Sequence, residues 1–380
     1  MGSKLSTRNS KETFKEQLTK ICLLKDYANF FHRKDTCGNF SKDHLNATKE
    51  QSIIQFIIDC DENEVPVIGD HETQESEGGE VDLHRYLVGC KKNPGHRQFI
   101  PVDTFTLKHL PEGLQNNDLY EYIKATADLT VRVDVKMTSL HRPKFYSRTT
   151  HPYPFYNMSD TKNLRTGTGR VKYVNKFEVG VTQNGDIGLT DHTKCWCRKC
   201  HNSDSPSNIW WEFRVYTATH VVFDEIEASH TTLRFFYDRE DSPMICVDKV
   251  TVRDVTIEYD ICQLKCVTCN NNLGNKLMFI WDHYESIRWK VCKNYKDSRF
   301  KHKFNFIVSH PHGCSKQVSV GQWKDKVENG GRTKFTYTTS TCPGSSGAHV
   351  YCVGYNDWWS LLIHSGSLKS GLNYSGDGRV

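Results

Sequence analysis

The chain has 380 residues, enough for two domains, one of them a β-barrel domain of roughly two hundred residues. Hydrophobic residues make up 37% of it and aromatic residues 12%, which argues against a disordered chain. A net charge of +5, spread over 50 Lys/Arg and 45 Asp/Glu, is too dilute to indicate nucleic-acid binding.

The N-terminus, Met-Gly-Ser-Lys-Leu-Ser, has no apolar signal-peptide core, and no apolar run of membrane-spanning length follows. We therefore expect a cytoplasmic protein whose 15 cysteines are thiols or metal ligands rather than disulfides. Gly2 and Ser6 fit the N-myristoylation pattern, and nearby basic residues would add an electrostatic attachment to a membrane. The alternative is that so short a pattern arose by chance.

Three regions precede the β-rich part of the chain. Residues 1–60 are expected to be a smaller helical N-terminal region, because apolar residues such as Phe14 and Leu18 recur at helical spacing. These helices would suit a protein partner that the sequence does not name. Residues 61–80 hold eight Asp/Glu and no Lys or Arg, which predicts a solvated acidic linker. Residues 81–127 mix strand-like and helical fragments, and we assign them as a connecting region.

From residue 128 to the C-terminus the sequence predicts a mainly β domain. Short runs of alternating apolar and polar residues recur between turn residues, with hardly any helical periodicity among them. Asn184-Gly185 is a strong hairpin signal between two such runs. The expected strands cover residues 129–135, 177–182, 213–222, 233–237, 250–259, 304–308, 318–323, 334–339 and 349–353.

Three segments of this domain carry residues suited to nucleophilic catalysis. Val-Tyr-Thr-Ala-Thr-His220 is a strand with a histidine near its end, and Asp260-Ile-Cys-Gln-Leu places an aspartate at the start of an apolar strand. Gly-Ser-Ser346-Gly is a glycine-flanked serine that leads into another strand. A serine hydroxyl is a weak nucleophile until an adjacent base accepts its proton.

Together these segments resemble the chymotrypsin-like (trypsin-like, PA-clan) serine peptidases, in which His, Asp and Ser occur in this chain order. Gly167-Thr-Gly169 also resembles the opening strand of many relatives. The resemblance implies a double β-barrel, with residues 128–380 as the trypsin-like peptidase domain. It further implies that His220, Asp260 and Ser346 form the catalytic triad, for which no cofactor is required.

The resemblance places the oxyanion hole at the backbone amides of Gly344 and Ser346. Secreted relatives have Asp before the nucleophile, to pair with a new N-terminus, whereas this chain has Ser345 there. It therefore looks closer to the intracellular and viral branches. Ser345 remains a rival nucleophile. His230, His310 and His312 are rival bases that could take the place of His220.

Two residues are candidates for substrate binding. Ser340, six residues before the nucleophile, corresponds to the floor of the S1 pocket, which holds the residue before the scissile bond (P1). Leu-Leu-Ile-His364-Ser-Gly is similar to a segment of glutamyl endopeptidases and picornavirus-type main peptidases, which implies that His364 binds Glu or Gln at P1. The alternative is that His364 is an ordinary strand residue.

Two cysteine clusters could hold a structural zinc, because such sites combine two pairs of ligands from separate segments. The ligand candidates of the first cluster are Cys195, Cys197, Cys200 and His201, and those of the second are Cys262, Cys266 and Cys269. Cysteines at even spacing along one strand are also typical of small core residues.

The function predicted from these residues is that of a serine endopeptidase, acting on a protein or peptide substrate through an acyl-enzyme. The alternative is a catalytically silent peptidase fold that serves as a binding or regulatory module.

Overall fold

A computed structural model of the chain describes residues 69–183, 190–329, 331–355 and 361–378. The described residues all belong to the second of the chain's two units, Glu64–Val380. The expected helical region and the myristoylation pattern at Gly2 therefore lie outside the described residues. Within the described part, no helix is both long and apolar enough to cross a membrane.

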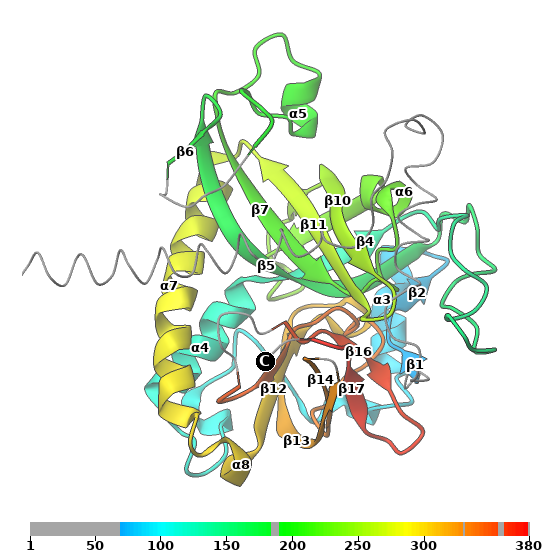
Figure 1. The fold of residues 1–380 in the computed structure, drawn as a ribbon, viewed down its shortest axis with the longest axis vertical. Helices are drawn as coiled ribbons and strands as arrows, with labels where there is room; N and C mark the ends of the chain where they lie inside the picture. The colour runs from blue at the N-terminus through cyan, green and yellow to red at the C-terminus, as the bar shows by residue number, and fades with distance from the viewer. Residues whose placement is uncertain (1–68, 184–189, 330, 356–360, 379–380) are drawn as a thin grey trace, which may run out of the picture. The chain divides into compact units, whose positions relative to one another are not determined.

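The second unit is mainly β and has the chymotrypsin-like double β-barrel fold (Figure 1). Its strands are β1 (Asp70–His71), β2 (Gln74–Ser76), β3 (Phe99–Pro101), β4 (Thr130–Val135), β5 (Leu164–Glu178), β6 (Val181–Thr182), β7 (Ile209–Thr217), β8 (Thr231–Phe235), β9 (Ile245–Val247), β10 (Val250–Thr256), β11 (Ile261–Thr268), β12 (Phe304–Ser309), β13 (Gln317–Asn329), β14 (Arg332–Tyr337), β15 (Val350–Cys352), β16 (His364–Ser367) and β17 (Asn373–Ser375). Its α-helices are α3 (Glu80–Val88), α4 (Asn117–Asp128), α5 (Arg198–His201), α6 (Glu225–Ser229), α7 (Asn271–Tyr295) and α8 (Arg299–His302), and its 3-10 helices are η2 (Pro94–His96), η3 (Leu107–His109) and η4 (Pro311–Gly313).

The strands form two antiparallel sheets, one for each barrel. One sheet has the order β10-β11-β7-β5-β4-β8-β9, with β2 and β6 also paired to β5. The other has the order β1-β16-β17-β14-β13-β12-β15, with β3 also paired to β13. The first sheet is thus built mainly from the N-terminal half of the unit and the second mainly from its C-terminal half. Strands β1 and β3 are the exceptions: β3 pairs with β13, and β1 lies beside β16 from the far end of the chain (Figure 1).

The expected strands other than residues 177–182 are confirmed, with shifts at their ends. The hairpin after residue 177 differs from the prediction, because Phe177 already pairs with Thr182. The turn therefore lies at Val179 and Gly180, where both residues have positive φ, rather than at Asn184-Gly185. Residues 184–189 lie outside the described part of the chain.

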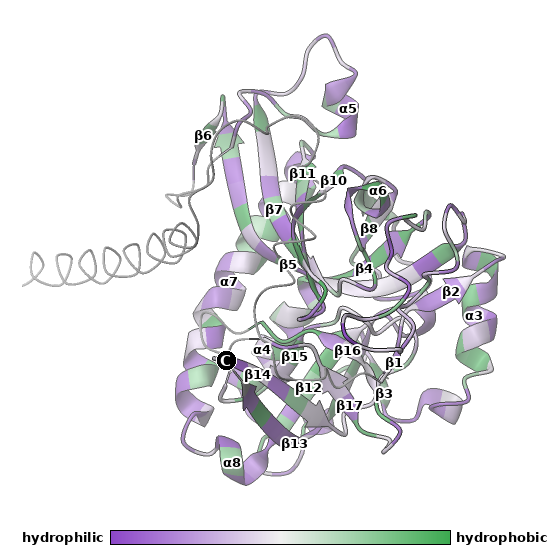
Figure 2. Cartoon of the chain, turned by 45° about the vertical axis from the view of Figure 1, so that its right-hand side comes forward, coloured by the Kyte–Doolittle hydropathy of each residue, from purple (hydrophilic) through white to green (hydrophobic). Residues whose placement is uncertain are grey.

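The 25-residue helix α7 is a correction to the expectation that little helix interrupts the strands. Asn270 caps its N-terminus by accepting a hydrogen bond from the amide of Leu273. Its buried residues recur three or four positions apart, as in Leu273, Leu277 and Ile280, which fits an amphipathic helix. Figure 2 shows hydrophilic and hydrophobic residues mixed along this helix.

The acidic stretch is a second correction. Its described part, residues 69–80, is not a solvated linker, because it contains β1 and β2 and enters α3. The side chains of Glu72, Gln74 and Ser76 are buried. A stretch of acidic composition is held here by backbone pairing to both sheets, which composition does not reveal.

The connecting region is part of the same compact unit as the barrels. Helix α4 begins at an Asn116 cap and buries Leu119, Tyr122 and Ile123 in the main hydrophobic core. Its apolar face packs against α7 and against β12, so this region helps to hold the two barrels together.

Candidate active site

The three predicted triad residues come together from the ends of three strands. His220 follows β7, Asp260 precedes β11, and Ser346 precedes β15. The Nε2 atom of His220 lies 2.7 Å from Oγ of Ser346, and its Nδ1 atom lies 2.8 Å from Oδ2 of Asp260. In this geometry His220 can take the serine proton as a base while Asp260 fixes the imidazole tautomer.

Asp260 is fixed by further contacts. Its Oδ1 atom accepts a hydrogen bond of 3.1 Å from the backbone amide of His220, and its Oδ2 atom accepts one of 2.6 Å from the hydroxyl of Ser365. Burial alone would raise the pKa of Asp260, but the charge and hydrogen bonds of His220, together with the Ser365 hydroxyl, hold that pKa below its usual range. Asp260 therefore stays ionised and can stabilise a protonated His220.

The loop that carries Ser346 needs its two glycines. Gly344 has φ of 97° and Gly347 has φ of 88°, a region that side chains disfavour. A Cβ atom on Gly344 would lie 2.4 Å from the carbonyl oxygen of His310, and one on Gly347 would lie 2.1 Å from that of Thr168. The glycines thus allow both the turn and its close packing.

Strand β5 supports this loop from the other barrel. The amide of Thr168 donates a hydrogen bond of 2.8 Å to the carbonyl oxygen of Ser346, and its hydroxyl donates one of 2.8 Å to that of Gly344. A Cβ atom on Gly167 would meet the Ser346 carbonyl at 3.0 Å. The Gly-Thr-Gly motif of the sequence therefore packs against the loop that carries Ser346 and supports it.

The amides predicted to form the oxyanion hole point at one atom. Those of Gly344 and Ser346 donate to the backbone carbonyl oxygen of Glu72, at 2.6 Å and 3.2 Å. Two convergent backbone donors stabilise the negative oxygen of a tetrahedral intermediate. Glu72 was not predicted as a site residue, and its acidic surroundings gave no signal of this role.

The side chain of Glu72 is buried and contacts His364. Its Oε2 atom lies 2.8 Å from Nε2 of His364, whose Nδ1 atom lies 2.6 Å from the hydroxyl of Tyr337. Lys92 also pairs with this carboxylate and donates to Asn373 at 2.9 Å. Burial alone would raise the pKa of Glu72, but His364 and Lys92 lower it to about 2.

The other predicted S1 residue, Ser340, has polar partners of its own. Its hydroxyl donates to the side chain of Gln98, and its carbonyl oxygen accepts from Ser319. The carboxylate of Glu72 instead contacts His364 and Lys92. Lys92 was missed by the sequence prediction because it lies in the region without a clear pattern.

The rival nucleophile and bases have other partners. The hydroxyl of Ser345 lies 3.0 Å from that of Ser309. His230 contacts the carbonyl oxygen of Ile226 at 2.8 Å on the surface. His310 and His312 are buried, the former with Nδ1 2.9 Å from the carbonyl oxygen of Cys314 and the latter with Nδ1 2.8 Å from Oε1 of Gln74.

A buried ion pair holds the histidine end of the triad. Arg142 and Glu227 are both fully buried, and Nε of Arg142 lies 2.7 Å from Oε1 of Glu227. Arg142 also donates a hydrogen bond of 3.1 Å to the carbonyl oxygen of His220. Arg165 pairs with the other Glu227 oxygen at 3.0 Å. Such pairs come from distant segments, so the sequence did not reveal them.

The two cysteine clusters meet in part. The sulfur atoms of Cys195, Cys197, Cys200 and Cys269 all lie within 4.8 Å of one another, and that of Cys269 is 3.5 Å from Cys197. His201 lies outside this group of sulfur atoms. The remaining members of the second cluster, Cys262 and Cys266, are packed in the main hydrophobic core instead.

Comparison with known proteins shows likeness only in structure. No protein-family model and no curated protein matches the chain. It is similar to the HtrA-type protease AlgW with tripeptide, at 10% identity and a TM-score of 0.35, with 68% of this chain and 58% of that chain covered. It is also similar to the active form of the Rv3671c protease from M. tuberculosis, at 10% identity and a TM-score of 0.32, with 67% and 78% covered.

The chain therefore spans less than two thirds of the length of AlgW. A likeness of this size says nothing about activity, and the function is inferred below from the side chains themselves.

Proposed function

We propose that this chain is a trypsin-like serine endopeptidase. Ser346 attacks the substrate carbonyl, His220 accepts the serine proton and returns it to the leaving amine, and Asp260 stabilises the charged imidazole. The resulting acyl-enzyme is hydrolysed by water. The observation that carries this proposal is the continuous chain of hydrogen bonds from Asp260 through His220 to Ser346, beside two converging amides.

We further propose that the peptidase cleaves after Glu, and less readily after Gln. His364 offers Nε2 to a P1 side chain, and Lys92 adds a positive charge that a carboxylate satisfies better than an amide. Ser340 is a proposed wall of the same region rather than a direct partner of the carboxylate.

The alternative module function also has an observation in its favour. The cleft holds the chain's own residue Glu72, and a silent module would hold a peptide in the same way without cutting it. Hydrolysis of fluorogenic peptides with Glu, Gln or Ala at P1 separates the two functions. The peptidase requires turnover of the Glu peptide that is lost in Ser346→Ala and retained in Ser345→Ala. No turnover by any form would favour the module.

A structural zinc at Cys195, Cys197, Cys200 and Cys269 is also proposed. Four thiolates from two segments fit the tetrahedral preference of zinc. Cys195, Cys197 and Cys200 precede β7 and Cys269 follows β11, so all four are distant in sequence from Ser346. Its role would be to hold the loop that contains α5. The triad chemistry needs no metal. Cytoplasmic location and myristoylation of Gly2 stay predictions.

A further inference from the structure

Residues 70–76 lie across the candidate active site in the manner of a bound substrate. On the N-terminal side of Glu72, Asp70 pairs with Ser367 and His71 with Gly366, so β1 extends the second sheet at β16. On its C-terminal side, β2 pairs with β5 of the first sheet, with Gln74 opposite Thr166. The segment thus crosses from one barrel to the other, with Glu72 between the two pairings.

Each backbone group of Glu72 meets the catalytic machinery. Its carbonyl oxygen accepts hydrogen bonds from both oxyanion-hole amides, and its amide donates one of 2.9 Å to Oγ of Ser346. The nucleophile is therefore in contact with the residue whose carbonyl is polarised. These contacts place the nucleophile beside the backbone of Glu72 and hold the Glu72 carbonyl oxygen on two converging donors, as attack on the bond between Glu72 and Thr73 would require.

The side chains of the segment also fit. The Glu72 carboxylate lies in the pocket of His364 and Lys92, which gives the bond a Glu at P1. The ring of His71 lies beside that of His220, with centroids 5.5 Å apart. On the other side of the bond, Gln74 accepts a hydrogen bond from His312. A Cβ atom on Gly366 would lie 2.1 Å from the Asp70 carbonyl, so the glycine leaves room for this pairing.

We propose that the chain is its own substrate and cleaves the bond between Glu72 and Thr73. This inference rests on the peptidase function proposed above. Oγ of Ser346 forms a bond to the carbonyl carbon of Glu72 while its proton passes to Nε2 of His220. The bond to the nitrogen of Thr73 then breaks as His220 gives that nitrogen the proton.

One water completes the reaction. It loses a proton to His220 and attacks the ester between Glu72 and Ser346, and the serine oxygen recovers the proton as it leaves. The products are a fragment of residues 1–72, ending in a new carboxylate, and a peptidase that begins at Thr73. The cut breaks the covalent link between the N-terminal region, with its Gly2 pattern, and the peptidase, and it leaves β1 on the fragment of residues 1–72.

Intact-mass measurement of the purified full-length chain over time tests this inference. The wild type is expected to give both fragments, with Thr73 as the new N-terminus, at a rate that does not change on dilution, because the segment reaches the site of its own chain. Ser346→Ala and Glu72→Ala are expected to stay intact. Glu77→Ala is the matched control, because this exposed glutamate belongs to the same acidic stretch, and it is expected to be cut like the wild type.

Peptide hydrolysis separates failure of the inference from failure of the function. A wild-type chain that stays intact while it hydrolyses Glu peptides would overturn self-cleavage alone. A chain that stays intact and hydrolyses no peptide, either as the wild type or as Glu72→Ala, which lacks the carboxylate that contacts His364 and Lys92, would overturn both. Cleavage that persists in Ser346→Ala would assign the cut to a contaminating peptidase and would also contradict the inference.

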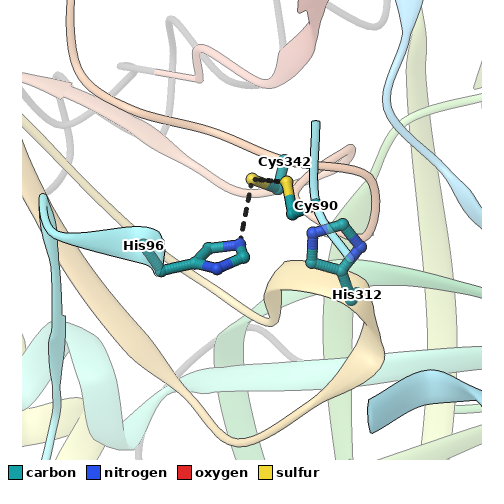
Figure 3. A group of neighbouring side chains, drawn as sticks. All are labelled: Cys90, His96, His312 and Cys342. Atoms are coloured by element: carbon teal, nitrogen blue, oxygen red, sulfur yellow. Dashed lines mark hydrogen bonds between the residues drawn. The ribbon is translucent and has the colours of Figure 1, made fainter. Parts of the chain in front are cut away.

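A second cluster of ligands lies beside the same segment. Cys90, His96, His312 and Cys342 point toward one another from three parts of the chain, and their ligand atoms all lie within 4.8 Å (Figure 3). The two sulfur atoms are 3.5 Å apart, and the Cys342 sulfur is 3.4 Å from Nε2 of His96. Ligands about 2.0–2.3 Å from a zinc ion lie at about these separations from each other in a tetrahedron.

The surroundings of the cluster also suit a metal. Nδ1 of His312 is held by Gln74, while its buried Nε2 has no hydrogen-bond partner within the described residues. A second hydrogen bond of this kind typically fixes the tautomer of a metal-binding histidine. Asn93 donates through Nδ2 to the Cys342 sulfur at 3.1 Å, as a donor to a thiolate would.

We infer that Cys90, His96, His312 and Cys342 bind a zinc ion. Its position would tie the loop that bears Lys92 to the loop that bears Ser346, because Cys90 and His96 flank the former and Cys342 begins the latter. The metal would position these loops and take no part in the chemistry. It is distinct from the four-cysteine site, with which it shares no ligand.

Zinc content per chain and the absorption of the cobalt-substituted protein test this site. The wild type is expected to bind one more zinc ion per chain than Cys90→Ser or His96→Ala. After substitution with cobalt, each variant should lose the thiolate-to-cobalt absorption of one site. His96 is only partly buried, so its variant is expected to fold. Cys352→Ser, at a buried cysteine outside both clusters, is the matched control. Unchanged zinc content in both ligand variants would overturn the inference.

Discussion

The carboxylate of Asp260 accepts a hydrogen bond from the backbone amide of His220 and also contacts Nδ1 of the His220 ring. One carboxylate therefore fixes both the backbone and the imidazole of His220. Asp260→Asn keeps the shape but offers an amide that favours the wrong tautomer. We expect kcat to fall by about 10⁴-fold with little change in KM. Steady-state kinetics on a Glu peptide measure this, and circular dichroism verifies the fold. An Asn variant with wild-type kcat would remove Asp260 from the triad.

Lys92 is expected to determine the choice between Glu and Gln at P1. Its ammonium pairs with the Glu72 carboxylate, whereas a glutamine would offer a neutral amide. A charge-assisted hydrogen bond contributes about 1.5–3 kcal/mol, so Lys92→Met should lower kcat/KM for Glu peptides by about 10–100-fold. Activity on Gln peptides should change much less. Exposed Lys91→Met is the neighbouring control, and equal losses on both peptides would contradict this role.

The buried pair of Arg142 and Glu227 is expected to make stability depend on pH. Burial alone would raise the pKa of Glu227, but Arg142 and Arg165 lower it from 4.5 to about 2. This stabilisation is complete above about pH 4.5 and is lost as the pH falls toward 2, where the folded carboxylate is protonated. Glu227→Gln should therefore reduce the free energy of unfolding by about 3–5 kcal/mol near neutral pH.

Urea unfolding of the wild type and Glu227→Gln at several pH values checks this. The difference between them should shrink as the pH falls below 4.5, the ordinary pKa of the carboxyl. A difference that stays constant with pH would show that the ion pair is not its source.

Gly344 is expected to tolerate no side chain. With an added Cβ, the backbone at residue 344 would have to leave its positive-φ conformation or displace the His310 carbonyl. Either movement turns an amide away from the oxyanion hole. Gly344→Ala should lower kcat by about 10²–10³-fold, the usual cost of one lost donor. Gly371→Ala provides the control, since Gly371 has a similar φ of 82° but open space around it. Equal activity of the two variants would exclude this account of the loop.

The sequence predicted the parts of the site that lie in short, local patterns. His220, Asp260 and Ser346 each stand beside recognisable neighbours, and alternating residues predicted most strands of both sheets. Helix α7 was missed although its apolar residues follow helical spacing, because strand-like runs surround it.

The rest of the site depends on contacts between distant segments. Glu72 and Lys92 belong to regions read as a linker and a connection, and nothing in their own neighbourhoods indicates a pocket. Ser340 was expected in S1 from its distance to the nucleophile, which stays a prediction, and the sequence did not reveal that its hydroxyl donates to Gln98. Cys269 was grouped along the chain with Cys262 and Cys266, which are packed in the core as small residues, whereas its sulfur lies near those of the first cluster.

The most direct test of the central claim is labelling with a fluorophosphonate, followed by mass mapping of the modified residue. We expect one label, on Ser346, in the wild type, in Ser345→Ala and in Glu72→Ala, which lacks the carboxylate that contacts His364 and Lys92. We expect none in Ser346→Ala. A folded Glu72→Ala protein that remains unlabelled at Ser346 would contradict an activated serine and would favour the silent binding module.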